Sequence, residues 1–195
     1  ALVFFWRSYT YSELAQQAEQ VAAWLAQQGV RAGDRVVLVM QNCPQLVIAH
    51  LGILRANAVV VSVNPMNRAE ELKHYLTDPD VRVAITTADL AAELARASNA
   101  LPAAQRLQHL LTTHFTDGFD AGGAEQPPAA WHPWLLGQHP APELQDGQVH
   151  SWADALATIA APPVHTAGPD DLAILPYTSG TTGLPKGCMH THASI

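Results

Sequence analysis

The chain has 195 residues, of which 48% are hydrophobic and 14% charged, a composition typical of a folded globular protein and not of a disordered one. Its formal net charge of −7 argues against a basic surface for nucleic acid, so any anion must be bound by local geometry. Because no apolar run is long enough for a transmembrane segment and Cys43 and Cys188 lack metal-ligand spacing, we expect a cytoplasmic protein with buried, reduced thiols.

Residues 1–113 predict an alternation of helices and strands. Thr10 and Glu13 have the spacing of a capping box, and apolar residues at helical spacing follow it as far as Gly29, where a left-handed cap would fall. The next segment, 35–40, is apolar on both faces, as strands are in a parallel sheet covered by helices. Further helices are predicted over 44–56, 67–76 and 89–97, and further strands over 59–63, 82–86 and 107–112.

Four strands alternating with three helices predict an α/β fold: a doubly wound, mostly parallel sheet flanked by helices, with right-handed crossovers. Asn67 and Glu70 are the predicted cap of the helix over 67–76.

Residues 114–150 break this pattern, since glycine and proline supply ten of the 37 positions and periodicity fails. We expect an irregular excursion, either a packed surface loop or a partly disordered segment, which Trp131 and Trp134 attach to the sheet. Regular structure then resumes in residues 151–195. This part is predicted to contain a helix over 151–159 with Ser151 and Asp154 at capping spacing, a linker over 162–168, and a strand over 172–178.

That last strand leads into residues 177–187, Tyr-Thr-Ser-Gly-Thr-Thr-Gly-Leu-Pro-Lys-Gly. Glycines let the backbone turn tightly and approach a ligand with its N–H groups, hydroxyls add donors, and Lys186 supplies a mobile charge for a terminal phosphate. The spacing differs from the Walker A pattern, which has four residues between its first glycine and Gly-Lys-Ser/Thr. A glycine-rich hairpin turn is the alternative, but a solvated turn requires neither four hydroxyls nor a lysine.

The same stretch, with Met189, Thr191 and His192 after it, resembles the phosphate-loop signature of the adenylate-forming (AMP-binding) superfamily. This group comprises acyl-CoA synthetases, non-ribosomal peptide adenylation domains and firefly-type luciferases. Three upstream segments resemble the family in the same order, so the resemblance covers nearly the whole chain outside 114–150. They are Tyr9–Leu14, Gly33–Val36 and the block from Leu51 to Pro65.

Two positions depart from the family pattern. Asn57 stands where the family usually has glycine, which we expect to alter a helix end, and Cys188 stands where valine is common. The Val-Asn-Pro ending of the middle block, where peptide-synthetase domains more often have Pro-Ile-Asp, favours the acyl-CoA ligases and, among them, the fatty-acid branch. An aryl-CoA ligase or a peptide-synthetase adenylation domain is the alternative.

The resemblance implies a two-step reaction in which a small-molecule carboxylic acid attacks ATP to give an acyl-adenylate, and coenzyme A then displaces AMP as co-substrate. The resemblance also allows a homodimer as the assembly of the whole enzyme from which this chain would come. Lys186 is the implied catalytic residue, and the hydroxyl of Thr178 is the implied ligand of Mg²⁺. The residues that would hold the β- and γ-phosphates are Thr178, Ser179, Gly180, Thr181, Thr182, Gly183 and Lys186.

On this resemblance, residues 1–195 are expected to be part of a large N-terminal AMP-binding domain. The family places its adenine-side segment, ribose-binding aspartate, hinge and C-terminal lysine after the phosphate loop, so we expect this chain alone to be inactive. A non-catalytic nucleotide-binding or interaction module is the competing hypothesis. His190 and His192, two residues apart, would share one face of a strand as some metal pairs do, but no third ligand stands at a useful spacing.

Overall fold

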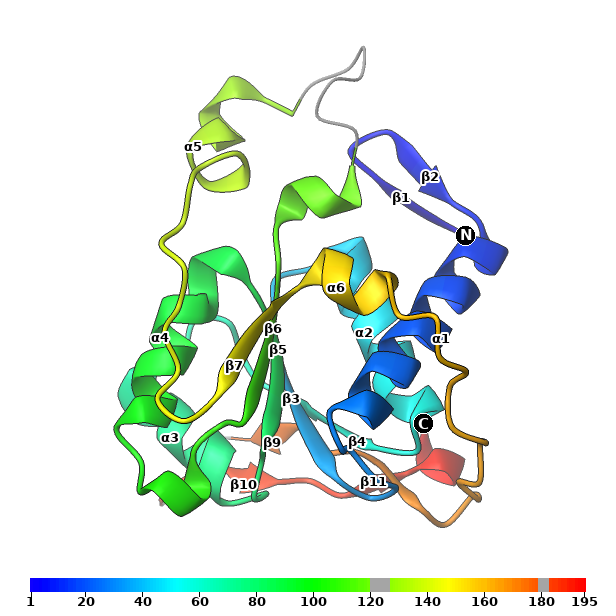
Figure 1. Cartoon of the computed structure of the whole chain (residues 1–195), viewed down its shortest axis with the longest axis vertical. Helices are drawn as coiled ribbons and strands as arrows, with labels where there is room; N and C mark the ends of the chain where they lie inside the picture. The colour runs from blue at the N-terminus through cyan, green and yellow to red at the C-terminus, as the bar shows by residue number, and fades with distance from the viewer. Residues whose placement is uncertain (120–126, 179–182) are drawn as a thin grey trace.

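The computed structural model describes residues 1–119, 127–178 and 183–195, and a seven-stranded sheet forms its centre (Figure 1). The strand order is β11-β8-β4-β3-β5-β6-β7, in which β11 is antiparallel to β8 and the other neighbours are parallel. The strands are β3 (Arg35–Val39), β4 (Val59–Ser62), β5 (Val83–Thr87), β6 (His109–Thr113), β7 (Gln148–Ser151), β8 (Leu172–Ile174) and β11 (His190–Thr191). The predicted mostly parallel sheet is therefore confirmed.

Helices cover both faces of this sheet, as the apolar strands require. They are α1 (Tyr11–Gln27), α2 (Pro44–Arg55), α3 (Ala69–Thr77), α4 (Ala88–Asn99), α5 (His132–Leu135) and α6 (Trp152–Leu156). Helices α1, α2 and α6 pack on one face, and α3 and α4 pack on the other (Figure 1). Among the described residues, no helix is both long enough and apolar enough to cross a membrane.

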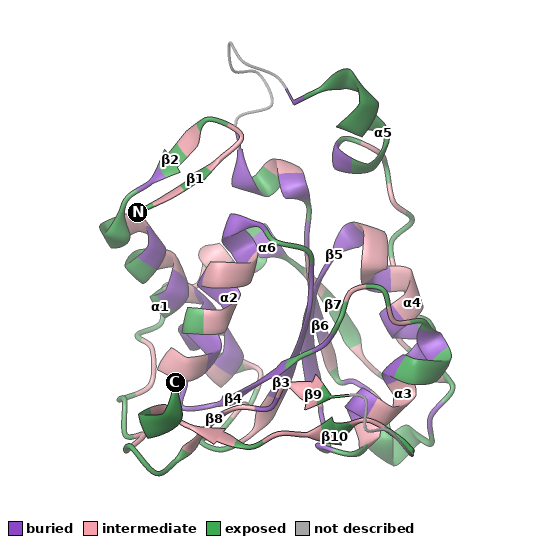
Figure 2. Ribbon diagram, turned by 180° about the vertical axis from the view of Figure 1, so that it is seen from behind, coloured by how far each residue is buried: buried purple, intermediate pink, exposed green. Residues whose placement is uncertain are grey.

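Strand β3 shows why the doubly wound arrangement is stable. Val36 and Leu38 belong to the core beneath α1 and α2, whereas Val37 and Val39 belong to the core beneath α3 and α4. All four side chains are buried, so neither face of the strand needs polar residues to meet water (Figure 2). The predicted two-sided burial of this segment is confirmed.

Helix α1 begins and ends where its sequence predicts. The Thr10 N–H donates to Glu13 Oε2 at 2.7 Å, and the Glu13 N–H donates to Thr10 Oγ1 at 3.1 Å, which completes the capping box. Past the last turn, Gly29 adopts a φ of +82°, a left-handed conformation that glycine reaches without strain.

Helix α3 begins later than predicted. The Arg68 N–H, not that of Asn67, donates to a glutamate three residues on, Glu71 Oε2 at 2.9 Å. Glu70 instead pairs with Lys73 at 2.8 Å, and the Asn67 N–H donates to the Asn64 carbonyl at 3.1 Å within the preceding turn. The predicted cap was wrong because two adjacent glutamates offer the same spacing in two registers, and the preceding turn selects the second.

The segment predicted to be irregular contains short helices and ends in an edge strand. Residues Gln148–Ser151 form β7, which pairs in parallel with β6, and the Ser151–Asp154 cap of α6 then forms as predicted. Helix α6 ends at Leu156 instead of Ile159. This strand was not predicted because a segment of four mostly exposed residues carries no distinctive apolar pattern.

The aromatic contacts of the two tryptophans are with rings that lie outside the strands of the central sheet. The Trp131 ring lies 5.8 Å from that of Phe5, and the Trp134 ring lies 4.9 Å from that of Phe115, measured between centroids. Phe5 is in the turn of an N-terminal hairpin formed by β1 (Leu2–Phe4) and β2 (Arg7–Tyr9), which the sequence did not predict. These contacts join the segment to neighbouring turns, and its predicted attachment to the sheet stays a prediction.

Asn57 holds the linker that leads to β8. Its φ of +62° is left-handed, the region in which the family's usual glycine would be unstrained. The side chain bridges to the linker: Oδ1 accepts from the N–H groups of Thr166 (2.7 Å) and Ala167 (3.0 Å), and Nδ2 donates to the Val164 carbonyl (2.9 Å). The expected effect of this departure from glycine on the helix end stays a prediction. The Asn57 side chain also binds a segment over a hundred residues later in the chain.

Candidate phosphate-binding site

The predicted strand over 172–178 is interrupted, and its last part belongs to a separate hairpin. β8 ends at Ile174, and Pro176, which has no N–H to donate, separates it from β9 (Tyr177–Thr178). β9 pairs antiparallel with β10 (Lys186–Gly187), so the chain turns back on itself between them. The register pairs Thr178 with Lys186 and Tyr177 with Gly187.

This register gives the hairpin two different faces. Directly opposed residues of an antiparallel pair project to the same side, so Thr178 and Lys186 share one face, and Tyr177 and Gly187 share the other. Both Thr178 and Lys186 are exposed to solvent. The structure therefore brings together a hydroxyl and an ammonium group from the two ends of the predicted phosphate loop.

The other predicted site residues are less informative. Ser179, Gly180, Thr181 and Thr182 lie outside the described residues. Gly183 is exposed, and a Cβ built on it would meet nothing within 4 Å, so its protein neighbours do not require glycine. At Gly187 the space is tighter, because a Cβ there would lie 3.2 Å from Tyr177 Cζ. The predicted approach of the glycines to a ligand stays a prediction.

The second face of the hairpin rests on α3. The Tyr177 hydroxyl donates to Asp78 Oδ2 at 2.6 Å, and the Tyr177 ring packs edge-on against Tyr75, with centroids 4.9 Å apart. Burial, and then the hydrogen bond to Asp78, raise the pKa of Tyr177 well above its usual range. The phenol is therefore a neutral donor at ordinary pH.

A second contact with α3 lies near the return strand. His74 Nε2 is 2.6 Å from the Pro185 carbonyl, and the His74 ring also meets the Tyr177 ring edge-on, at 5.7 Å. The sequence alone does not indicate His74 or Asp78 as site residues, since contacts that span 111 and 99 residues leave no local pattern.

The exposed face of the hairpin can offer charge and hydrogen bonds to an anion. Among the ion pairs of the described residues, Lys186 takes part in none, so its ammonium is available to a ligand. The Thr178 hydroxyl lies 3.7 Å from the thiol of Cys188, which is free and half-buried, unlike the fully buried Cys43. Neither Thr178 nor Lys186 has a neighbouring base in these contacts, so the arrangement suits electrostatic stabilisation.

The metal hypotheses can be compared with the side chains present. The described residues contain no group of three or more His, Cys, Asp or Glu side chains able to hold an ion. Mg²⁺ often takes only one or two protein oxygens and completes its shell with phosphates and water, so the Thr178 hydroxyl fits as a single ligand. His190 and His192 do not share one strand face as expected. β11 ends at Thr191, so His190 lies in the strand and His192 begins the 3₁₀ turn that follows it.

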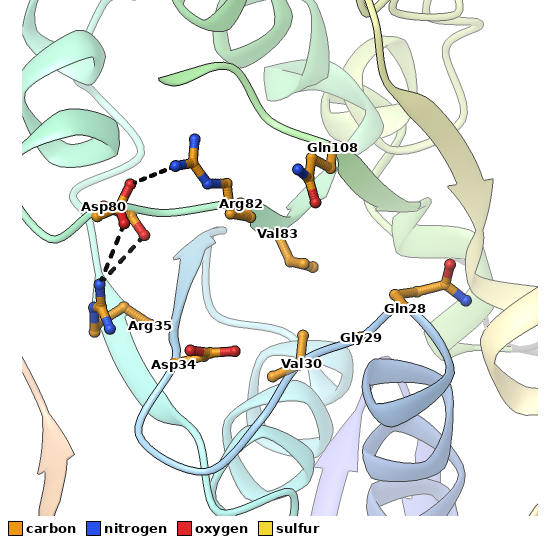
Figure 3. A pocket seen from close by; sticks show the side chains of 9 residues that line it. All are labelled: Gln28, Gly29, Val30, Asp34, Arg35, Asp80, Arg82, Val83 and Gln108. Carbon is orange, nitrogen blue, oxygen red and sulfur yellow. Dashed lines mark hydrogen bonds and ion pairs between the residues drawn. The ribbon is translucent and has the colours of Figure 1, made fainter. Parts of the chain in front are cut away.

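A separate hollow of about 200 Å³ lies at the amino ends of β3, β5 and β6 (Figure 3). Its two guanidinium groups, Arg35 and Arg82, both face Asp80, at 3.9 and 2.9 Å. Ligands of open α/β sheets bind outside the carboxyl ends of the strands, and the cations here are already paired. This hollow is therefore a weaker candidate than the hairpin.

Comparison with known proteins covers the whole chain. Residues 1–195 match the family described as AMP-binding enzyme. A long-chain-fatty-acid–CoA ligase of Bacillus subtilis is 31% identical over 100% of this chain and 34% of its own length. A 4-coumarate–CoA ligase 3 of Oryza sativa subsp. japonica is 33% identical over 96% of this chain and 28% of its own length. The chain thus spans about a third of the length of these curated relatives.

Solved structures agree with the sequence relatives. A benzoate CoA ligase from Burkholderia xenovorans LB400 superposes with a TM-score of 0.68 at 26% identity, covering 95% of this chain and 30% of that one. The N-terminal domain of FACL13 from Mycobacterium tuberculosis superposes with a TM-score of 0.63 at 27% identity, covering 94% of this chain and 37% of that one. The doubly wound sheet is therefore the fold of known members of this group.

Proposed function

Because this chain belongs to the AMP-binding enzyme family, we propose that its β9–β10 hairpin holds the phosphates of ATP in an acid–CoA ligase reaction. The observation that supports this most directly is the pairing of Thr178 with Lys186 on one exposed face. We assign the β- and γ-phosphates to this face, with Gly183 and residues 179–182 contributing between the two strands.

The chemistry requires charge stabilisation and positioning. A carboxylate oxygen attacks the α-phosphorus of ATP, the bond between the α-phosphorus and the α,β-bridging oxygen breaks, and pyrophosphate leaves with the electron pair. The thiol of coenzyme A then adds to the acyl carbon and AMP departs. Lys186 would stabilise the charge that grows on the leaving pyrophosphate, and the Thr178 hydroxyl would orient an adjacent oxygen. When bound, Mg²⁺ would neutralise part of the same charge, and Thr178 is the residue that would hold it.

We propose a fatty acid as the carboxylate substrate, on the Val-Asn-Pro sequence of residues 63–65. The curated relatives include ligases of long-chain fatty acids and of 4-coumarate, so an aryl acid is the second candidate. ATP–pyrophosphate exchange by the enzyme that carries this chain, measured with dodecanoate and with 4-coumarate, distinguishes them. Exchange with 4-coumarate alone would overturn the fatty-acid assignment.

The two free cysteines support a cytoplasmic location.

Binding of inorganic tripolyphosphate tests the site itself. The chain contains two lysines, Lys73 and Lys186, so Lys186→Ala and Lys73→Ala remove the same charge from two places. We expect calorimetric titration to show binding to the wild-type chain, about tenfold weaker binding to Lys186→Ala, and little change in Lys73→Ala. Equal losses in the two variants would mean that general charge attraction, and not the hairpin, binds the anion.

Binding and turnover are separate expectations for this chain. We propose that residues 1–195 bind tripolyphosphate without exchanging ATP and pyrophosphate, because the family completes its active site with later segments. Robust exchange by the 195-residue polypeptide would refute that proposal. A chain that neither binds tripolyphosphate nor exchanges would favour a non-catalytic interaction module.

A further inference from the structure

The hairpin contacts α3 through β9 and through the residue just before β10, and these contacts converge on a single helix face. Tyr177, in β9, bonds to Asp78, and Pro185, just before β10, bonds to His74. His74 and Asp78 are four residues apart, so they project from the same side of α3. Tyr75 lies beside them and is buried under the Tyr177 ring.

We propose that this α3 seat, formed by His74, Tyr75 and Asp78, sets the position of the phosphate-binding hairpin. His74 and Asp78 are its positioning residues, because each holds one end of the loop without reaching the phosphate face. This role rests on the proposed function of the hairpin, and it concerns residues that are not among the predicted site residues.

The direction of each hydrogen bond is determined by its partners. A proline carbonyl can only accept, so His74 must carry its hydrogen on Nε2, and it donates in both the neutral and the charged state of the ring. The Tyr177 phenol donates to the carboxylate of Asp78, because an ionised carboxylate has no hydrogen to donate. Each contact therefore joins a donor to an acceptor.

The seat leaves the other face of the hairpin free. Tyr177 and Gly187 face α3, and the absence of a side chain at Gly187 lets β10 lie against the Tyr177 ring. Thr178 and Lys186 consequently point away from the helix. An anion can bind to that face while the hairpin keeps its contacts with α3.

Holding the β9–β10 hairpin against α3 lowers the conformational entropy that anion binding must remove. An unattached hairpin loses freedom when it binds an anion, and this loss reduces affinity. A hairpin that is already bonded to one helix loses less. The seat should therefore affect anion affinity even though none of its residues touches the anion.

A double-mutant cycle across the Tyr177–Asp78 bond tests this. We expect Tyr177→Phe and Asp78→Leu each to weaken tripolyphosphate binding about fivefold, and the double variant to be no weaker than either single one, since both remove the same bond. Asp78→Asn keeps an acceptor and should stay near the wild type. Glu70→Leu makes a comparable change on the exposed side of α3 and should leave the affinity unchanged.

Hydrogen exchange separates failure of the seat from failure of the phosphate assignment. In His74→Phe and Asp78→Leu, the amides of Gly187 and Cys188 should exchange faster, while the urea midpoint of the whole chain changes little. If the wild type fails to bind tripolyphosphate, the proposed function is wrong, and exchange alone then decides about the seat. Unchanged exchange at these amides, or independent losses in the double variant, would overturn the seat.

Discussion

Replacing Asn57 tests whether a single side chain secures the linker before β8. Asn57→Gly removes the three hydrogen bonds to Val164, Thr166 and Ala167, but gives the left-handed position the residue that suits it. Asn57→Ala removes the same bonds and keeps a Cβ at a φ of +62°. The two variants therefore differ only in backbone strain.

The expected magnitudes follow from these contacts. A hydrogen bond contributes about 0.5–1.5 kcal/mol net, but Val164 and Thr166 are exposed, so water replaces part of what is lost. A left-handed conformation costs a residue with a Cβ about 1–2 kcal/mol. We expect the free energy of unfolding to fall by about 1–2 kcal/mol in Asn57→Gly and by about 2–4 kcal/mol in Asn57→Ala.

Urea denaturation followed by tryptophan fluorescence measures these differences. Hydrogen exchange at the Thr166 and Ala167 amides, which should accelerate in both variants, shows that the linker is the region released. If Asn57→Ala is as stable as the wild type, the bridge contributes nothing. If Asn57→Ala is no less stable than Asn57→Gly, the strain argument is wrong.

Two further predictions concern the core and the sheet edge. Gly52→Ala would place a Cβ 2.7 Å from Val21 Cγ1 where α1 meets α2, so urea titration should show a loss of about 1–3 kcal/mol despite better helix propensity; a smaller loss in a Val21→Ala background is the control. Burial lowers the pKa values of the hydrogen-bonded pair His109 and His150 below their ordinary 6.5, so protons favour the unfolded chain as pH falls. The stabilisation from the neutral pair should be fully present above pH 6.5 and decline below it. His150→Gln should therefore reduce the change of the urea midpoint between pH 7.5 and 5.5.

The α/β framework was predictable because its signals are local and repeated. Apolar strands such as 35–39 must be buried on both faces, and that requirement alone calls for helices on two sides of a parallel sheet. The capping boxes at Thr10 and Ser151 have the same character, since each is completed within four residues. The composition of residues 177–187 likewise indicated a phosphate loop without any knowledge of its tertiary contacts.

Features that depend on distant partners were not predictable. Strand β7 exists because β6 offers it an open edge, and α3 begins at Arg68 because the preceding turn selects Glu71 over Glu70. Trp131 packs on Phe5, in a hairpin that has no strong strand pattern of its own. In each case several local solutions have similar energies, and contacts elsewhere in the fold decide among them.

The hairpin at 177–187 combines both kinds of information. Its residue types are enough to indicate phosphate chemistry, because glycine, hydroxyl and lysine act through properties that each residue carries by itself. Which face remains free for a ligand depends on the register that pairs Thr178 with Lys186 and on the docking of Tyr177 against α3. Those are geometric relations between segments about a hundred residues apart, and only the folded chain brings them together.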